Sequence, residues 1–481
     1  MSMKTAFDTN KTPSITGITC DSRKVKPGYA FIAIEGFNED GHKYIEEAIA
    51  NGAKLIFTEK DISTTRQAKI IKVDNTRSLL GQLASEFYHN PSQKINVIGV
   101  TGTNGKTTTT HLIYNLLNYN QKQTGLIGTV KVDNGQNTLE GKLTTPPPVL
   151  LQKYLSQMVD NNLNYACMEV SSHGIKLERI KGTRFAVKVG TNISTDHYDL
   201  HANFKEYLKV KKSFLKDKNS DTLVLINNDD SYLNNTGKLA RNQLNYSLSN
   251  NSTITAENIK HKNISTEFIY NINKNNYINY NSCKLPLKIP IKMYLLGQHN
   301  IYNALIAITI ALYYDKKPKS IQNFFKSYTG IWRRLQILYN NKFTIIDDCA
   351  HNPGSYTAVF NTIKDLNYND LIIVNSLRGN RGVNINKENA QTISDWMPRL
   401  GNYNLYTTNC EDVVKPDDKV SPEEEKQFLN ILKQKKVNYT HYQNLKPVLK
   451  QAVTTVSTDD LILLLGPHAM DEAGKMILEM I

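Results

Sequence analysis

Short, almost continuous apolar runs recur along the chain and alternate with longer stretches in which apolar and polar residues are mixed. Runs such as INVIGV at 95–100, YACMEV at 165–170 and TLVLIN at 222–227 predict buried strands, and the mixed stretches between them predict helices. Strands that alternate with helices indicate a mostly parallel sheet with helices on both faces. The longest apolar run, YNALIAITIALYY at 302–314, is shorter than the roughly 20 residues that span a bilayer, so it predicts a buried helix and no membrane partner.

The same pattern divides the 481-residue chain into three α/β domains. Residues 1–92 combine the strand-like GYAFIAIEG with the helix-like HKYIEEAIANGAKLIF and end in a polar linker. Residues 93–330 hold the alternating runs, and their Asn-rich part between about 245 and 292 predicts inserted antiparallel strands. Residues 331–481 contain the strands FTIIDDCAH, LIIVNS and LILLLG, which predict a Rossmann-like third domain.

Composition adds little about activity but limits the partners. Hydrophobic residues make up 40% and charged residues 21% of the chain, as in ordinary folded proteins. The formal net charge is +14, but the lysines are spread along the chain, so we expect a basic surface that attracts anionic substrates and no nucleic-acid partner. The five cysteines form no C-x-x-C pair, and MSMKTAF shows no signal peptide, so we expect reduced thiols in a cytoplasmic protein.

The most specific local motif is VTGTNGKTTTTHLI at 100–113, a glycine loop between a predicted strand and a predicted helix. Its backbone N–H groups and the helix N-terminus can bind a polyphosphate, Lys106 can contact the outer phosphates, and the Thr107 hydroxyl can reach Mg²⁺. The common phosphate-loop pattern would have a glycine at position 100, where this chain has Val100. We expect a central P-loop-type domain, in which this loop is a damaged motif, a chance match or a loop from another class of ATP enzyme.

Two further segments carry candidate ligands. Glu169 follows a predicted strand in MEVSSH, where a carboxylate could hold a second hard cation or could equally be a surface or helix-capping residue. The segment NISTDHYDLHANF packs Asp196, His197, Asp199 and His201 into six residues. These side chains could ligate a metal, and a capping aspartate with solvated histidines is an equally good local interpretation.

Taken in order, these segments resemble the Mur ligases, the ATP-dependent amino-acid ligases of peptidoglycan precursor synthesis, over nearly the whole chain. TGTNGKT at 101–107 matches the family's loop fully, which explains the missing glycine. CDSRKVKPGYAFIAIEGFNEDGHKY, LTTPP and MEVSSH resemble the MurE branch, whose members add an amino acid to UDP-MurNAc-L-Ala-D-Glu. The resemblance implies ATP and two Mg²⁺ ions as cofactors, the UDP-MurNAc-dipeptide and a free amino acid as partners, and a monomer.

The resemblance also implies roles for the residues at matching positions. The implied nucleotide-binding residues are Thr103, Asn104, Gly105, Lys106, Thr107, Thr108, Asn300, Asn303, Arg334 and Asp348. The implied metal ligands are Thr107, Glu169, His197 and Lys211, the last as a carbamylated lysine. The implied substrate-binding residues are Ser22, Arg23, His42, Thr144, Thr145, Ser171, Arg179, Arg381 and Asp412. Catalysis is assigned to Lys106, Lys211, His197 and Arg334, through an acyl phosphate and with closure of the third domain over the second.

The departures from the family concentrate in the amino-acid pocket. Where diaminopimelate-adding members have D-N-P-R, this chain has TTNCEDVV at 407–414, and the best register places Asp412 opposite the arginine. A reversed charge favours a basic amino acid such as lysine or ornithine, unless the loop is shifted and the carboxylates face solvent. In the late G-K-G-H-E motif, GPHAMDE aligns Met470 with the glutamate, unless the loop slips to Asp471.

These departures leave alternatives open. One is a divergent Mur-type ligase that extends another carboxylate, such as a folylpolyglutamate-like, cyanophycin-like or pseudomurein-like precursor. Another is a non-catalytic nucleotide-binding relative, against which the presence of Lys106, Glu169, His197 and Lys211 counts.

Overall fold

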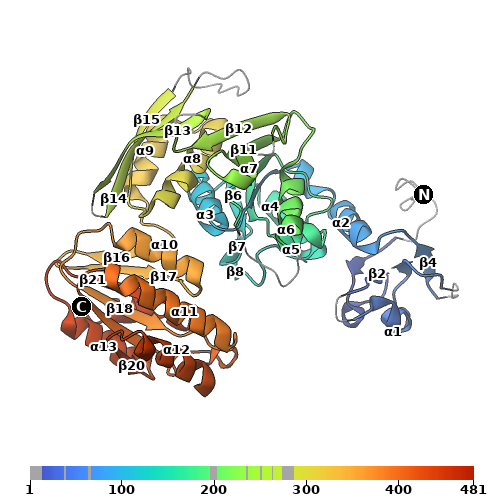
Figure 1. The fold of residues 1–481 in the computed structure, drawn as a ribbon. Helices are drawn as coiled ribbons and strands as arrows, with labels where there is room; N and C mark the ends of the chain where they lie inside the picture. The colour runs from blue at the N-terminus through green and yellow to red at the C-terminus, as the bar shows by residue number, and fades with distance from the viewer. Residues whose placement is uncertain are drawn as a thin grey trace. The chain divides into compact units, whose positions relative to one another are not determined.

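In the part of the chain that the structure describes, the strands form three sheets, of four, eleven and six strands (Figure 1). The structure is a computed structural model, and the described residues are 14–36, 39–62, 67–194, 203–234, 237–249, 252–262, 264–273 and 287–481. They belong to two compact units. One comprises the chain up to Thr255 with Asn303–Lys316, and the other comprises Ala256–Asn273, residues 287–302 and Lys317–Ile481.

The four-stranded sheet is parallel, with its strands in sequence order. It contains β1 (Gly17–Thr19), β2 (Tyr29–Ile32), β3 (Leu55–Thr58) and β4 (Lys69–Lys72). Alternate residues of β2 face opposite layers, since Ile32 packs with α2 (Thr76–Phe87) and Phe31 packs with α1 (Ile45–Ala50). The stretch expected to be helical through residue 57 is divided: Gly52 (φ 94°) turns the chain after α1, and the apolar residues beyond it form β3.

The eleven-stranded sheet has the order β15-β14-β13-β12-β11-β10-β5-β9-β6-β7-β8. Its strands are β5 (Asn96–Thr101), β6 (Thr124–Ile127), β7 (Lys131–Asp133), β8 (Thr138–Glu140), β9 (Tyr165–Glu169), β10 (Val187–Gly190), β11 (Leu223–Asn227), β12 (Asn242–Ser247), β13 (Ile254–Lys262), β14 (Ser265–Ile272) and β15 (Leu287–Met293). Pairing is parallel from β13 through β12, β11, β10, β5 and β9 to β6. Of the strands expected to be antiparallel inserts, β14 and β15 pair that way, whereas β12 and β13 are parallel.

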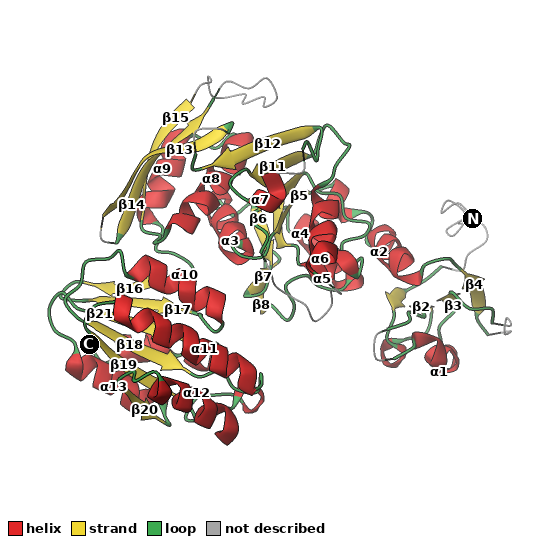
Figure 2. Cartoon of the chain, in the orientation of Figure 1, coloured by secondary structure: helices red, strands yellow, loops and turns green. Residues whose placement is uncertain are grey.

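Helices cover the parallel strands on both faces, as the alternating pattern predicts (Figure 2). The helices that accompany this sheet are α3 (Lys106–Leu117), α4 (Pro148–Asp160), α5 (Ser172–Lys176), α6 (Phe204–Leu215), α7 (Ser231–Asn234), α8 (Gln298–Tyr313) and α9 (Pro318–Ser327), of which α9 packs on the antiparallel strand β15. The connections β5–α3–β6 and β6–α4–β9 run in opposite directions along the sheet, and right-handed crossovers therefore place α3 and α4 on opposite faces. The carboxyl ends of β5, β9 and β10 meet at one edge.

The six-stranded sheet has the order β16-β17-β21-β18-β19-β20, and only β16 is antiparallel to its neighbour. Its strands are β16 (Gln336–Asn340), β17 (Thr344–Asp348), β18 (Leu371–Ser376), β19 (Tyr403–Thr408), β20 (Tyr439–Tyr442) and β21 (Leu461–Leu465). Its helices are α10 (Pro353–Ile363), α11 (Val383–Trp396), α12 (Pro422–Gln434), α13 (Leu445–Thr455) and α14 (Ala473–Leu478). Both faces are covered, because Ile373 packs with α10–α12 and Ile372 packs with α13 and α14.

Short 3-10 helices occupy several connections. They are Ser22–Lys24, Gly41–Tyr44, Pro91–Gln93, Met397–Arg399, Pro416–Asp418 and His468–Met470. None of the helices in the described ranges combines the length and the apolar character that crossing a membrane requires. The α/β fold class expected from the sequence is confirmed.

Candidate active site

The phosphate-loop sequence, residues 101–107, forms a turn between β5 and α3, which we call the phosphate turn. Gly102 (φ 153°) and Gly105 (φ 84°) adopt backbone conformations that other residues rarely take, and a Cβ on Gly102 would lie 1.8 Å from Thr191 Oγ1. Lys106 begins α3, and its Nζ donates to the carbonyls of Gly102 and Thr103, at 2.9 Å each. The turn thus brings a lysine and a helix N-terminus to one point, an arrangement that binds polyphosphates.

Side chains from neighbouring segments hold this turn in place. The hydroxyl oxygen of Thr103 lies 2.9 Å from the hydroxyl of Tyr207 and accepts from the backbone N–H of Ser194. The backbone N–H of Asn104 donates to Asn192 Oδ1 at 2.9 Å. The loop backbone is therefore ordered by the protein itself, which lowers the entropic cost of binding a nucleotide.

Glu169 lies beside the turn, at the carboxyl end of β9, and is 1% exposed. Its Oε2 accepts from Thr107 Oγ1 at 2.8 Å, and its Oε1 accepts from the backbone N–H of Thr129 at 2.8 Å. A hydroxyl and a carboxylate in contact are hard oxygen donors of the kind that Mg²⁺ prefers, so these two residues fit a Mg²⁺ ion at the phosphates. Within the described ranges, no three histidine, cysteine, aspartate or glutamate side chains cluster as a metal site.

Lys211 reaches the same turn from α6, where it is 1% exposed. Its Nζ donates to the carbonyl of Gly102 at 2.7 Å and lies 4.8 Å from the centre of the Tyr207 ring. The structure therefore brings Lys211 to the phosphate turn, although the two residues are 109 positions apart. Its expected partner, His197, lies outside the described residues.

The α8 residues expected to meet the nucleotide are both buried. Asn303 Oδ1 accepts from Thr109 Oγ1 at 2.9 Å, and this oxygen would lie 3.1 Å from a Cβ at Gly105. Asn303 therefore packs directly against the phosphate turn. Asn300 donates from its amide to a backbone carbonyl one turn earlier, at 2.7 Å. The remaining loop residue in the predicted set, Thr108, is half-buried.

Most of the residues expected to hold the muropeptide in this region converge on the end of β9. Thr145 Oγ1 donates to the carbonyl of Glu169 at 2.9 Å and accepts from the backbone N–H of Ser171 at 2.9 Å. Arg179 donates to the carbonyl of Thr145 at 2.9 Å. Thr144 accepts a hydrogen bond at 3.0 Å from a threonine that also binds the Glu169 carboxylate. Thr144, Thr145, Ser171 and Arg179 are thus joined by hydrogen bonds at the carboxyl end of β9.

The N-terminal candidates are mostly engaged inside their own domain. Ser22 is buried and donates to a glutamate of α1 at 2.7 Å. His42 uses both ring nitrogens, one with the Asp40 carboxylate at 2.6 Å and one as the acceptor of a backbone N–H. The side chain of Arg23 is 82% exposed and pairs with Asp21 at 2.8 Å, which holds the pKa of that carboxyl near 2. Arg23 is the member of this set that is accessible to a ligand.

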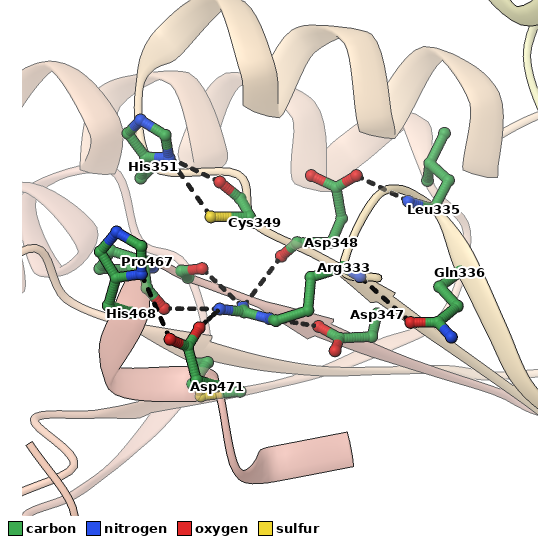
Figure 3. A network of polar contacts seen from close by, with 12 residues as sticks. Arg333, Leu335, Gln336, Asp347, Asp348, Cys349, His351, Pro467, His468 and Asp471 are labelled. Atoms are coloured by element: carbon green, nitrogen blue, oxygen red, sulfur yellow. Dashed lines mark hydrogen bonds and ion pairs between the residues drawn. The ribbon is translucent and has the colours of Figure 1, made fainter. Parts of the chain in front are cut away.

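Sequence reasoning selected Arg334 and missed its neighbour Arg333, which is 1% exposed. Figure 3 shows the Arg333 guanidinium between two carboxylates, 3.1 Å from Asp347 Oδ1 and 2.8 Å from Asp471 Oδ1. Arg334 is half-buried, and its side chain makes no hydrogen bond to a residue that the structure describes. Asp348 is 7% exposed and accepts a backbone N–H of the same turn at 2.8 Å.

Burial dominates the ionisation of the two adjacent carboxyls. It raises the pKa of Asp347 to about 6, because loss of solvent outweighs the attraction of the Arg333 guanidinium. Burial also raises the pKa of Asp348, against the opposing charges of Arg334 and Arg333. The arginines therefore have to compensate buried negative charge in this domain, which explains why Arg333 points inward.

The expected amino-acid contacts lie elsewhere in the C-terminal domain. Arg381 is exposed and lies 3.4 Å from Asp418. Asp412 is also exposed, and its two oxygens accept the backbone N–H groups at the start of α13, at 2.7 and 3.1 Å. In the late motif, Met470 is fully buried in the core, and Asp471 joins the polar network with Arg333.

The turn before α3 and the buried carboxylate beside it, set in α/β domains, are typical of an enzyme that binds ATP with Mg²⁺. Three family matches agree: residues 14–88 match the "Mur ligase family, catalytic domain", residues 100–311 the "Mur ligase middle domain" and residues 333–468 the "Mur ligase, glutamate ligase domain". The chain belongs to the Mur ligase family, whose members are ATP-dependent ligases that form peptide bonds.

Relatives in the MurE branch are similar along most of the chain. The UDP-N-acetylmuramoyl-L-alanyl-D-glutamate–2,6-diaminopimelate ligase of Caldanaerobacter subterraneus subsp. tengcongensis is 30% identical, over 95% of this chain and 90% of that protein. The ligase of the same name from Clostridium botulinum is 36% identical, over 79% of this chain and 77% of that protein.

Solved structures share the three-domain fold. A ligase structure carrying the same diaminopimelate name has a TM-score of 0.69 and 20% identity, over 97% of this chain and 95% of that one. The MurF ligase from Thermotoga maritima, solved in complex with ADP, has a TM-score of 0.61 and 18% identity, over 96% of each chain.

Proposed function

We propose that this protein joins an amino acid to UDP-MurNAc-L-Ala-D-Glu in an ATP-dependent reaction of peptidoglycan precursor synthesis. The observation that carries the proposal is the contact between Thr107 of the phosphate turn and the buried carboxylate of Glu169. Thr145 binds the backbone carbonyl of Glu169, Ser171 binds Thr145, and Thr144 is linked to the carboxylate through a neighbouring threonine. Relatives named for this reaction cover most of the chain.

In the proposed mechanism, the chain's residues bind two anions that repel each other. The acceptor carboxylate attacks the γ-phosphorus of ATP, the bond to ADP breaks, and an acyl phosphate forms. Lys106 lies at the turn that would hold the phosphates, and Arg334 is proposed as a second cation. A Mg²⁺ ion held by Thr107 and Glu169 would supply further positive charge at the phosphates.

In the second step, the neutral amine of the incoming amino acid attacks the acyl carbon. The C–N bond forms, inorganic phosphate leaves, and the amine loses a proton to solvent or to phosphate. No protein nucleophile takes part in this sequence. The protein's task is to position the two substrates and to offset their charge.

We propose that Lys211 acts as a carbamate. The neutral amine would add to CO₂, forming an N–C bond and releasing one proton, and the anionic product would supply oxygen ligands to Mg²⁺. Its burial and its position at the carbonyl of Gly102 support this role, because an unmodified ammonium at this point would repel a metal ion.

For the amino acid, we propose a basic one such as lysine or ornithine. Between residues 407 and 414 the chain has no arginine to pair with a distal carboxylate and carries the exposed acids Glu411 and Asp412. The relatives compared above are named for diaminopimelate, which makes that amino acid the alternative to exclude. Asp412 also caps α13, so its effect on selection would add to a structural role.

The test is phosphate release from ATP with UDP-MurNAc-L-Ala-D-Glu and single amino acids. We expect lysine or ornithine to stimulate turnover more than diaminopimelate does. Glu169→Gln should abolish turnover, whereas Glu178→Gln, nearby in sequence, serves as the matched control. If no amino acid stimulates turnover with this acceptor, the proposed function is wrong; if diaminopimelate is preferred, only the basic-amino-acid proposal fails.

A further inference from the structure

The turn that carries Arg334 has an unusual backbone. Arg333 (φ 53°) and Leu335 (φ 47°) both adopt the left-handed conformation, one on each side of Arg334. Non-glycine residues hold this conformation only when their surroundings impose it, and such strain gathers at functional sites. Trp332, at the start of the same turn, is 47% exposed, so the strain does not serve to bury an aromatic ring.

The Arg333 guanidinium uses all of its donor groups to hold two other segments. Nε contacts Asp347 and Nη2 contacts the carbonyl of Asp348, both at the end of β17, at 3.1 and 3.4 Å. Nη1 donates to the Pro467 carbonyl and to Asp471, at 2.8 Å each, and Nη2 donates to the Gly466 carbonyl at 2.7 Å. Three of these five contacts reach the loop that follows β21. Figure 3 shows the guanidinium beside Pro467 and Asp471 of this loop.

These contacts are not needed to hold the strands together. β17 and β21 already pair in parallel, from Thr344↔Leu461 to Asp348↔Leu465. Asp347 and Asp348 are the last two residues of β17 in this ladder, whereas the other three contacts reach residues beyond the end of β21. Because a buried ion pair adds little net stability compared with apolar packing, its main consequence is to fix one conformation of the segments that it joins.

We propose that Arg333 is a positioning residue that locks the Arg334 turn and the loop after β21 (residues 466–472) into one rigid unit. The proposal rests on the proposed function, in which Arg334 meets ATP, and on the family resemblance, which implies that the late-motif loop belongs to the amino-acid pocket. Through this lock, the cation for the nucleotide and the loop for the amine keep a fixed spacing. Arg333 itself touches neither substrate.

The geometry also explains why another cation cannot take this place. A lysine ammonium has three donors at one point, whereas the guanidinium presents five in a planar fork. Here the five donors are shared between two segments, the end of β17 and the loop after β21. A lysine at position 333 would keep the charge between Asp347 and Asp471 but could hold only one of the segments firmly.

The test uses the full chain with Trp396→Phe, which leaves Trp332 as the single tryptophan reporter in the turn. In this background we compare Arg333→Met, Arg333→Lys and the exposed-pair control Arg184→Met. We expect Arg333→Met to increase acrylamide quenching of Trp332 and amide exchange in both 331–336 and 466–472. We also expect it to weaken ATP binding about tenfold and to raise KM for the amino acid more than it lowers kcat.

Arg333→Lys should keep amide exchange slow in only one of the two segments, 331–336 or 466–472. Arg184→Met should change none of these quantities. If Arg333→Met fails to fold, the double variant with Arg333→Met and Asp347→Asn is measured in its place. This double variant removes the buried cation together with its buried partner carboxylate. Loosening of 466–472 with unchanged Trp332 quenching and ATP affinity would overturn the proposal. A protein that releases no phosphate would show that the proposed function is wrong. If amide exchange and ATP affinity still respond to Arg333→Met as expected, the positioning role of Arg333 stands.

Discussion

At the scale of single residues, Lys211 and Arg333 are deeply buried cations within the described part of the chain. Lys211 and Arg333 are each 1% exposed, and a buried charge is stable only with partners. Arg333 has two carboxylates and three carbonyls around it. Lys211 donates to the carbonyl of Gly102 and lies over the face of the Tyr207 ring.

The carbamate proposal predicts the behaviour of Lys211→Ala. We expect its rate of phosphate release to fall by about 100-fold or more, since even changes outside the first ligand shell of a metal cost roughly 10- to 100-fold. Added short-chain carboxylates such as acetate should restore part of the rate by supplying the missing oxygens. Lys209→Ala, on the exposed face of the same helix, is the matched control. Full activity of Lys211→Ala would refute the role.

The raised pKa of Asp347 predicts a pH-dependent stability. A carboxyl with a native pKa of about 6 and a lower unfolded pKa holds its proton more tightly when folded, so its contribution is present below pH 4 and is lost as the pH rises through 6. The free energy of unfolding of wild type minus that of Asp347→Asn should therefore fall by up to about 2 kcal/mol as the pH rises from 4.5 to 7.

Tryptophan fluorescence during urea unfolding measures this difference, because both tryptophans, Trp332 and Trp396, lie in the C-terminal domain. Buried histidines such as His351, whose pKa burial lowers to about 4, titrate in both proteins and cancel from the difference. Asp365→Asn, at an exposed position, is the control. A difference that rises with pH would contradict the predicted sign.

Single residues could be predicted from the sequence where a motif fixes the backbone. The sequence predicts a turn between a strand and a helix at Lys106 and Thr107, and the structure has that turn, because glycines, a strand and a helix at fixed spacing determine the loop. Phosphate binding by these two residues stays a prediction. Arg333 could not be separated from Arg334, because which of two adjacent arginines points inward depends on a left-handed backbone and on carboxylates far away in sequence.

At the scale of elements, the loop between β18 and α11 is held by one carboxylate. The backbone N–H groups of Asn380, Arg381 and Gly382 donate to Glu424 at 3.2, 3.1 and 2.9 Å. Glu424 is 4% exposed and also completes the capping box of α12 with Ser421. Burial opposes its ionisation, but these donors hold the pKa of Glu424 below its ordinary value.

We therefore predict that Glu424→Gln loosens the loop that carries Arg381. A charged acceptor of three backbone donors is replaced by one neutral oxygen, which removes about 1.5–3 kcal/mol of interaction. Amide exchange at 378–383 should accelerate, and KM for the amino acid should rise about tenfold with a smaller change in kcat. Glu423→Gln changes the same helix terminus at an exposed position and should leave both quantities unchanged. Unchanged exchange in Glu424→Gln would show that the helix alone orders this loop.

The elements were predictable where their signal is local. Apolar runs located β5, β9, β11, β17, β18 and β21, because strands buried on both faces need nearly continuous apolar sequence. The direction of β12 and β13 was not predictable, since an alternating pattern identifies a strand but not its neighbour. The helix expected to run through Phe57 was too long, because Gly52 ends α1 and the apolar residues beyond it have strand partners on both sides.

At the scale of the whole molecule, charge is the property that the sequence defines best. The formal net charge is +14, and both proposed anionic substrates must approach this surface. A positive protein raises the local concentration of anions, and salt weakens the effect as the screening length falls from about 10 Å at 0.1 M to about 3 Å at 1 M. The lysines are spread along the chain, so the attraction should act on any multivalent anion.

We predict that raising KCl from 0.1 to 0.4 M increases KM for ATP and for UDP-MurNAc-L-Ala-D-Glu by about two- to fivefold. KM for lysine should stay constant or fall, because the same field repels a cationic amino acid. The kcat at saturating substrate should change little, since screening acts on the encounter of the protein with its charged substrates and saturation removes that step from the rate. Potassium glutamate in place of KCl separates screening from competition by chloride at the phosphate turn. If KM for lysine rises in parallel with the other two, salt is weakening the fold or the site, and long-range attraction does not contribute to substrate capture.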